Sequence, residues 1–179
     1  MDGILAEIIK AIWILIPAYA ANAFPTLAGG KHPIDGGRKF MDGNRIFGDG
    51  KTVEGFSIGI LAGIFYGSIQ WYFYPIVQNY LQLYAVEIPQ MSLSLAFLIS
   101  LGAMMGDLAG SFVKRRFGMK RGEKWMIDKI NFIAGAILFS SLMVDYTLIT
   151  LIFMFAITIL AHRFANIVSY TLKLKRVPW

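Results

Sequence analysis

The sequence predicts an all-α, multi-pass membrane protein in which residues 1–179 form one integral membrane domain with five transmembrane helices. Hydrophobic residues make up 56% of the chain and the mean hydropathy is +0.58, far above soluble domains of this size. Apolar stretches of about 20 residues follow one another, and that length crosses roughly 30 Å of hydrocarbon. Cysteine is absent, which excludes a disulfide framework and a thiolate metal site.

The first predicted span covers Ile4–Phe24, and Pro25 ends it. Pro17 predicts a kink inside this span, because a proline nitrogen cannot donate to the helix ladder. Asp2 and Glu7 lie where a signal peptide would carry basic residues, so no cleavable leader is expected.

A loop of mixed charge, Pro25–Thr52, follows the first span and contains seven glycines. A connector this long is uncommon unless it is functional or disordered. Apolar side chains such as Phe40 and Phe47 alternate with its charges, which argues against disorder. Pro33–Arg38 and Asp42–Arg45 have the composition of tight turns. We therefore expect a folded cap that presents charged groups over a site.

The second predicted span runs from Val53 to about Ile76, and the third covers Leu93–Phe112. Glycines recur every four residues in the second span, at Gly55, Gly59, Gly63 and Gly67. Such a ridge of small residues lets another helix approach closely. A basic connector, Lys114–Lys124, leads to the fourth span, Met126–Val144. Only Asp145 and Tyr146 then precede the fifth span, Thr147–Leu172.

Positive charge predicts the orientation of these spans. The first and third connectors carry five and six Lys or Arg residues, the second and fourth carry none, and the C-terminal tail carries three. Basic residues mark the cytoplasmic side of a membrane protein. The N-terminus is therefore expected outside, and the C-terminus and the two charged loops, about residues 25–52 and 114–125, in the cytoplasm.

The stretch from Gly106 to Asn131 carries the chemical signal. Asp107, Ser111 and Lys114 are spaced i, i+4 and i+7, so a helix places them on one face. Asp128 and Asn131 repeat the arrangement at the start of the following span. Carboxylates on both sides of a cluster of Lys and Arg suit a divalent cation and a polyphosphate.

Asp107 lies within apolar sequence, where a lone carboxylate costs about 2.5–3.5 kcal/mol on insertion scales. A purely structural alternative is a neutralising pair with Lys114 or Arg163. His162 is not a predicted metal ligand, because the other histidine, His32, lies in a loop.

Two parts of the chain resemble the phosphatidate cytidylyltransferase family. Its signature is an Asp, a Ser four residues later, then Lys-Arg and a distal Asp, and it matches Gly106–Leu108, Ser111–Arg116 and Asp128. The first loop looks like the archaeal branch of that family, the CDP-archaeol synthases. The stretches that carry this likeness are Asn22–Pro25, Pro33–Gly37 and Gly48–Gly55. The resemblance extends from Asn22 to about Asn131.

The resemblance implies an Mg²⁺-dependent cytidylyltransferase of phospholipid biosynthesis in the cell membrane, with its active site at the cytoplasmic face. CTP and 2,3-bis-O-(geranylgeranyl)-sn-glycerol 1-phosphate would give the CDP-activated lipid and pyrophosphate; neither nucleic acid nor a protein partner is implied. Asp107 and Asp128 would hold the metal, and Lys114 completes the catalytic set. The substrate-binding residues would be Ser111, Arg115, Lys120, Arg121, Asp35, Arg38, Arg45, Lys51 and Asn131.

One departure from the bacterial signature concerns its second acid, which comes shortly after the distal Asp-Arg. In this chain Asp128 is followed by Lys129 and then Asn131. Either one cation ligand differs here, or Asn131 serves through its carbonyl oxygen.

The alternative function is a small proton- or cation-coupled transporter with Asp107, Asp128 and His162–Arg163 as an intramembrane relay. The acids lie toward one interface, beside loops rich in Lys and Arg, which favours the enzyme. A CDP-alcohol phosphotransferase is a second rival, but its Asp-Gly-x-x-Ala-Arg motif with two later aspartates on one helix is absent.

Overall fold

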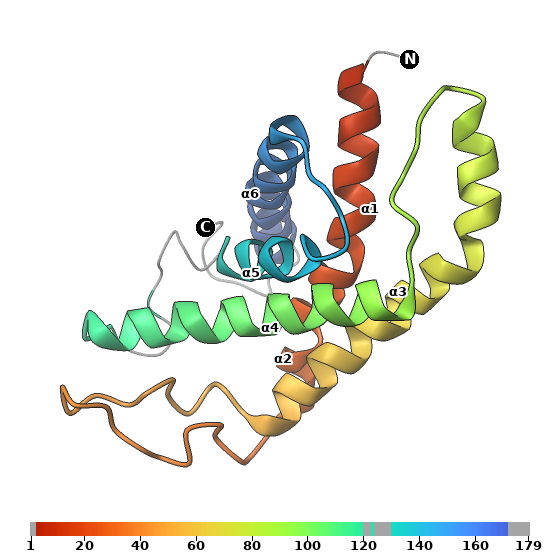
Figure 1. The fold of residues 1–179 in the computed structure, drawn as a ribbon. Helices are drawn as coiled ribbons and strands as arrows, with labels where there is room; N and C mark the ends of the chain where they lie inside the picture. Colours follow the sequence, from red (N-terminus) through yellow and green to blue (C-terminus); the bar gives the residue numbers. More distant parts are fainter. Residues whose placement is uncertain (1–2, 120–122, 124–129, 172–179) are drawn as a thin grey trace.

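A computed structural model describes residues 3–119, 123 and 130–171. Five principal helices and one short helix follow in order (Figure 1). They are α1 (Gly3–Ala23), the short α2 (Pro25–Ala28), α3 (Val53–Gln82), α4 (Leu93–Arg116), α5 (Asn131–Ser140) and α6 (Leu148–Thr171). The predicted all-α class with five main helices is confirmed.

Three of the described helical segments are long and apolar enough to cross a membrane. They are Gly3–Leu27, Val53–Gln82 and Leu93–Arg116. Asn131–Ser140 and Leu148–Phe164 are shorter apolar helices. The prediction of five full-length spans is therefore confirmed only in part: the described residues form three long spans and two shorter apolar helices.

Helix α4 continues beyond the predicted end of its span. Lys114, Arg115 and Arg116 form its last turn rather than the start of a connector. Cationic side chains are favoured there because they complement the negative end of the helix dipole. The chain leaves the helix at Gly118, whose φ of 68° suits glycine.

Helix α5 ends at Ser140, four residues before the predicted Val144. The backbone amides of Met143 and Val144 both donate to the Ser140 carbonyl at 2.9 Å, which closes a turn. The Ser140 hydroxyl also meets the Tyr146 hydroxyl at 2.7 Å. The connector to α6 is therefore Ser141–Thr147, and the predicted start of this span, residues 126–129, lies outside the described residues.

Glycines bring α3 and α4 together, as the ridge predicts. A Cβ atom at Gly63 would collide with the Ser100 hydroxyl, and one at Gly67 would collide with the Cβ of Ala96. A second glycine contact joins α4 to α5, where a Cβ at Gly102 would collide with the Gly135 carbonyl. Helix α4 therefore packs between α3 and α5, and the glycines let the helix backbones approach closely.

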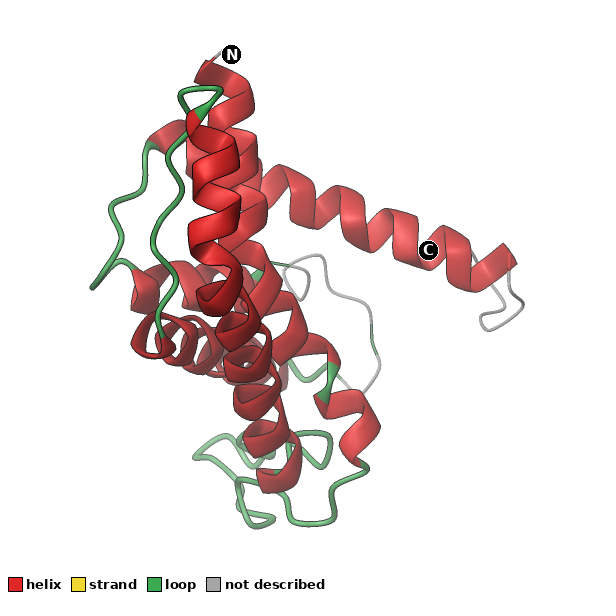
Figure 2. Cartoon of the chain, turned by 90° about the vertical axis from the view of Figure 1, so that its right-hand side faces the viewer, coloured by secondary structure: helices red, strands yellow, loops and turns green. Residues whose placement is uncertain are grey.

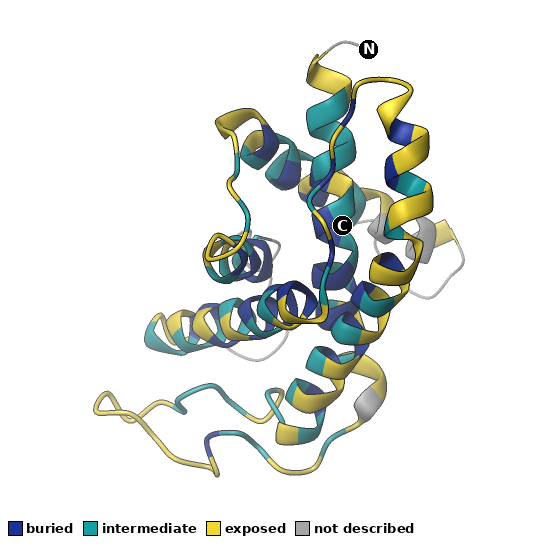
Figure 3. Cartoon of the chain, turned by 45° about the vertical axis from the view of Figure 1, so that its right-hand side comes forward, coloured by how far each residue is buried: buried dark blue, intermediate teal, exposed yellow. Residues whose placement is uncertain are grey.

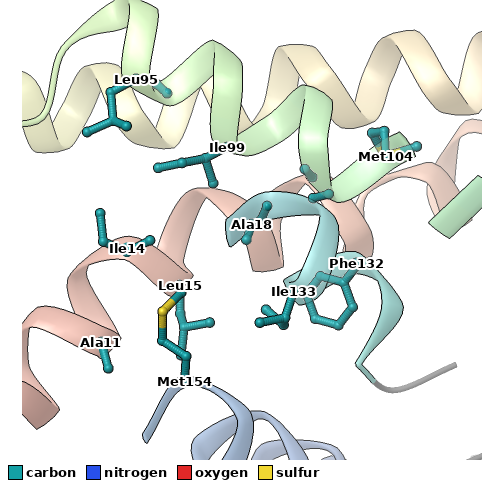
Figure 4. Close-up of a cluster of buried hydrophobic side chains, with 14 of the residues drawn as sticks. Ala11, Ile14, Leu15, Ala18, Leu95, Ile99, Met104, Phe132, Ile133 and Met154 are labelled. Carbon is teal, nitrogen blue, oxygen red and sulfur yellow. The ribbon is translucent and has the colours of Figure 1, made fainter. Parts of the chain in front are cut away.

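The core forms where α1, α4, α5 and α6 meet. Its side chains are buried, and those labelled in Figure 4 include Ile14, Leu15, Ile99, Phe132 and Met154. Exposed residues cover the first loop and much of α3 (Figure 3). Helix α6 projects from the other helices (Figure 2).

Candidate active site

The C-terminal half of α4 forms one wall of a cavity of about 720 Å³. Asp107, Ser111, Lys114 and Arg115 line this wall, so the predicted common face is confirmed. The opposite wall is the end of the first loop, which lies beside this half of α4 (Figure 1). Its lining residues are Asn44, Arg45, Phe47, Gly48, Asp49, Gly50 and Lys51.

Asp35 organises the loop from within. Its side chain is fully enclosed, and Arg45 donates to both carboxylate oxygens, from Nε at 3.3 Å and from Nη2 at 2.5 Å. The backbone amides of Gly37, Phe47 and Gly48 donate to the same carboxylate at 3.0–3.1 Å. Burial alone would raise the pKa of Asp35, but Arg45 and these amides outweigh it and hold the pKa well below its ordinary value.

Arg116 fastens the loop to α4. Its guanidinium donates from Nη2 to the Arg45 carbonyl at 2.6 Å and lies 3.3 Å, through Nε, from a carboxylate oxygen of Asp42. The same group lies 4.6 Å from the Phe40 ring centroid and 4.7 Å from that of Phe112. One side chain thus joins an ion pair, a carbonyl and two aromatic rings.

Asp107 is paired with Lys51, the last loop residue before the residue that caps α3. The contact joins Lys51 Nζ to Asp107 Oδ2, and the side chains are 27% and 30% exposed. The structural alternative, in which Lys114 or Arg163 neutralises Asp107, is therefore wrong about the partner, which is Lys51. Lys114 is 8% exposed and donates to the Glu123 carbonyl at 2.7 Å.

The cavity is rich in cationic groups, and one of their nitrogens is unsatisfied. Arg45 donates from Nη1 to Asp49 at 2.6 Å on the loop side. On the α4 side the Arg115 Nε is buried and has no hydrogen-bond partner among the described residues. A buried unsatisfied guanidinium nitrogen is costly, so an anion in this cavity would be stabilised there.

Not all the predicted site residues line this cavity. Asp35 and Arg38 border a separate hollow of about 450 Å³ on the loop. Asn131 lies on α5, and a Cβ atom at Gly110 would collide with its amide nitrogen. Lys120, Arg121 and Asp128 lie outside the described residues.

An apolar groove of about 570 Å³ runs between α4 and α5. Small side chains form much of it, and Asn131 is its polar member. Its lining residues are Met105, Gly106, Ala109, Gly110, Val113, Asn131, Ala134, Gly135, Leu138 and Phe139. Consecutive residues of α4, such as Gly110 and Ser111, therefore line different hollows, the first apolar and the second polar.

The described residues fit a divalent cation that is bound together with phosphates. No group of three or more His, Cys, Asp or Glu residues that could hold a metal ion by itself is present in the described part of the chain. Mg²⁺ does not require one, because it is usually held by one or two carboxylates, water and substrate phosphates. Asp107 offers a partly exposed carboxylate inside the cavity, with the Ser111 hydroxyl on the same wall.

Sequence reasoning gave no role in the site to Arg116 or to the wall residues Asn44 and Asp49. Phe112 precedes Arg116 by four residues and lies on the same helical face, which was the available signal for Arg116. The partners Phe40 and Asp42 come from another segment, which spacing along one helix does not reveal.

Comparison with known proteins agrees with this architecture. A family model for CarS-like CDP-archaeol synthases matches residues 4–179. The chain is 42% identical over 178 residues to a CDP-archaeol synthase of Thermococcus gammatolerans, covering 99% of both chains. It is 40% identical over 181 residues to one of Aeropyrum pernix, covering 100% of this chain and 97% of the relative.

A solved structure shares the fold. It is described as an intramembrane enzyme for archaeal membrane lipid biosynthesis, and it superposes with a TM-score of 0.76 at 38% sequence identity. The match covers 89% of this chain and 94% of that one. The predicted family is therefore confirmed, and this chain belongs to the CDP-archaeol synthase family.

Proposed function

We propose that the cavity transfers a cytidylyl group from CTP to 2,3-bis-O-(geranylgeranyl)-sn-glycerol 1-phosphate, giving the CDP-activated lipid and pyrophosphate. The observation that carries the proposal is that α4 lines two different hollows at once. One face of the helix presents Asp107, Ser111 and Lys114 to a polar cavity, and the adjoining face lines an apolar groove. A substrate pair made of a nucleotide and a lipid needs both surfaces side by side.

The nucleotide phosphates would lie among the cationic groups of the cavity. Lys114 and Arg115 approach from α4, and Arg45 and Lys51 approach from the loop. Ionised hydrogen bonds of this kind are roughly twice as strong as neutral ones. Lys120 and Arg121 continue the same basic stretch, and we assign them to the outer phosphates.

Asp107 would hold Mg²⁺, and Asp128, which follows the basic stretch, is the proposed second carboxylate. When bound, the metal would neutralise charge on the reacting phosphate oxygens. Asn131 lies beside Gly110 of α4, at the groove, and is the proposed alternative ligand through its carbonyl oxygen if one cation ligand differs from the bacterial pattern.

The reaction forms a bond between a lipid phosphate oxygen and the α-phosphorus of CTP and breaks the bond to the β-phosphate. Pyrophosphate carries away the electron pair of the broken bond. The lipid phosphate is already anionic, so no strong general base is required. Lys114 and Arg115 would therefore act by holding the phosphates in line and by stabilising charge on the leaving group.

A prenyl chain would lie in the α4–α5 groove. The groove is almost wholly apolar, and its small residues leave room for methyl branches. Burying the chain there keeps it out of water while its phosphate reaches around α4 to Ser111. We place this reaction at the cytoplasmic membrane interface, which both CTP and the lipid can reach.

Two loop residues take different roles in this proposal. Asp35 would act by ordering the loop, since its carboxylate is enclosed and fully hydrogen-bonded. Arg38 is exposed at the outer hollow, where it would meet a nucleotide only if the loop closed further.

The decisive test supplies the detergent-purified protein with labelled CTP, Mg²⁺ and the prenylated glycerol phosphate. Label should move into the lipid, and Asp107→Asn should abolish this transfer while the protein stays inserted and folded. If the wild-type protein transfers no label to the lipid, the proposed reaction is wrong. A transporter would instead move a cation or proton across vesicles without consuming CTP.

A further inference from the structure

The backbone of Lys51 is held in place by hydrogen bonds, and its side chain reaches Asp107. Its carbonyl accepts a hydrogen bond from the Ile34 amide at 2.8 Å, and its own amide donates to the Gly48 carbonyl at 3.2 Å. The next residue, Thr52, caps α3 by accepting from the Gly55 amide at 3.2 Å. The backbone is therefore anchored at the start of a long helix, and the side chain carries the freedom to move.

The Lys51 ammonium already neutralises the carboxylate that would receive the metal. A free divalent cation that approaches Asp107 must displace this ammonium. The displaced ammonium then stays within a few ångströms of the cation and repels it. The metal brings no anion to replace the carboxylate that the ammonium gives up, so binding of the metal alone is opposed.

A nucleotide changes this balance because it brings anionic oxygens into the same cavity. The cavity is about 720 Å³ and is lined by both Lys51 and Asp107. An ammonium on a flexible stem can exchange the carboxylate for a phosphate oxygen without any shift of the backbone. The metal then replaces the ammonium at Asp107, and the two binding events favour each other by equal factors.

We infer that Lys51 shields Asp107 from free divalent cations and releases it only to a metal–nucleotide complex. This inference rests on the proposed function and concerns the order in which that site fills. It predicts that metal affinity is low without CTP and rises strongly with it.

The test measures Mn²⁺ binding to the full-length protein in detergent, from the loss of the free-ion electron paramagnetic resonance signal. Without nucleotide, Lys51→Met should bind Mn²⁺ about tenfold more tightly than the wild type, a change of about one logarithmic unit in Kd. Lys51→Arg keeps the charge and should bind like the wild type. Lys39→Met is the matched control, since Lys39 is exposed on the same loop and does not line the cavity.

Two further measurements test whether the change in Mn²⁺ affinity arises at Asp107. Adding Asp107→Asn to Lys51→Met should remove the gain in Mn²⁺ affinity. Once the Mn²⁺ that CTP binds without protein is subtracted, adding CTP should raise the Mn²⁺ affinity of the wild type by a larger factor than that of Lys51→Met. Equal Mn²⁺ affinity in Lys51→Met and wild type, or an equal response to CTP, would overturn the inference. Since no lipid is present, failure here is distinct from failure of cytidylyl transfer.

Discussion

Asp35 accepts hydrogen bonds from Arg45 and from three backbone amides, so the shape of the cavity wall depends on its negative charge. Asp35→Asn keeps the size of the side chain but loses that charge, and should loosen the loop. We expect the KM for CTP to rise about tenfold, about 1.4 kcal/mol, with little change in thermal unfolding of the helices. Asp145→Asn, in an exposed connector outside the site, serves as the control; an unchanged KM in Asp35→Asn would contradict the ordering role.

The same carboxylate sets a pH limit on loop order. The pKa of Asp35 is lowered in the folded state, so its stabilising contribution is complete above the ordinary value of about 3.9 and is lost as pH falls below it. Amide protection at Phe47 and Gly48, measured by hydrogen exchange, should hold at about pH 5 and weaken only in more acidic solution.

Spacing along one helix predicted which residues share the α4 face, but it could not name their partners. Asp107, Ser111 and Lys114 were placed together because one periodicity governs them. The contacts of Asp107 with Lys51, and of Arg116 with Phe40 and Asp42, depend on how the loop folds back. Those pairings arise from tertiary packing, and no local pattern in the sequence predicts them.

Hydropathy located the helices but did not determine where each of them ends. Apolar runs located all five main helices, since burial in lipid or in a core demands them. The true ends of α4 and α5 depend on other groups. Lys114–Arg116 extend α4 because a helix C-terminus favours cations, and the Ser140 turn stops α5 within apolar sequence.

The contact between α4 and α5 depends on glycine at both helices. Gly102→Ala adds a methyl group where the Gly135 carbonyl lies, and backbone cannot yield as a flexible side chain can. We expect destabilisation of about 1–3 kcal/mol, seen as a lower Tm in detergent. Gly3→Ala is the matched control, because no atom lies within 4 Å of the added methyl group there. Equal Tm values for the two variants would show that the helices do not touch as described.

The apolar groove offers a test that separates the lipid from the nucleotide. Ala134→Phe adds a ring at a position that lines the groove and does not line the polar cavity. The KM for the prenylated lipid should rise by at least about tenfold while CTP binding stays unchanged. Ile152→Phe, on an exposed position of α6, controls for an added aromatic ring. Loss of CTP binding in Ala134→Phe would show that the two hollows do not act as separate subsites.

At the scale of the whole molecule, the charged loop and the C-terminal end of α4 lie beside each other (Figure 1). The polar cavity is lined by both of them. The connectors at residues 83–92 and 141–147 carry no Lys or Arg. This asymmetry matches the distribution of basic residues in proteins whose charged loops face the cytoplasm. It also matches the reaction we propose, since CTP must enter from water.

The absence of cysteine makes this orientation directly measurable, because a single introduced thiol has no competitor in the chain. Met41→Cys places the thiol in the first loop, at a side chain that is 96% exposed, and Leu83→Cys places it in the opposite connector, at one that is 77% exposed. In intact cells an impermeant thiol reagent should label Leu83→Cys and spare Met41→Cys, and inverted vesicles should show the reverse. Labelling of Met41→Cys from outside would place the cavity on the side without CTP, and the proposed reaction could not take place there.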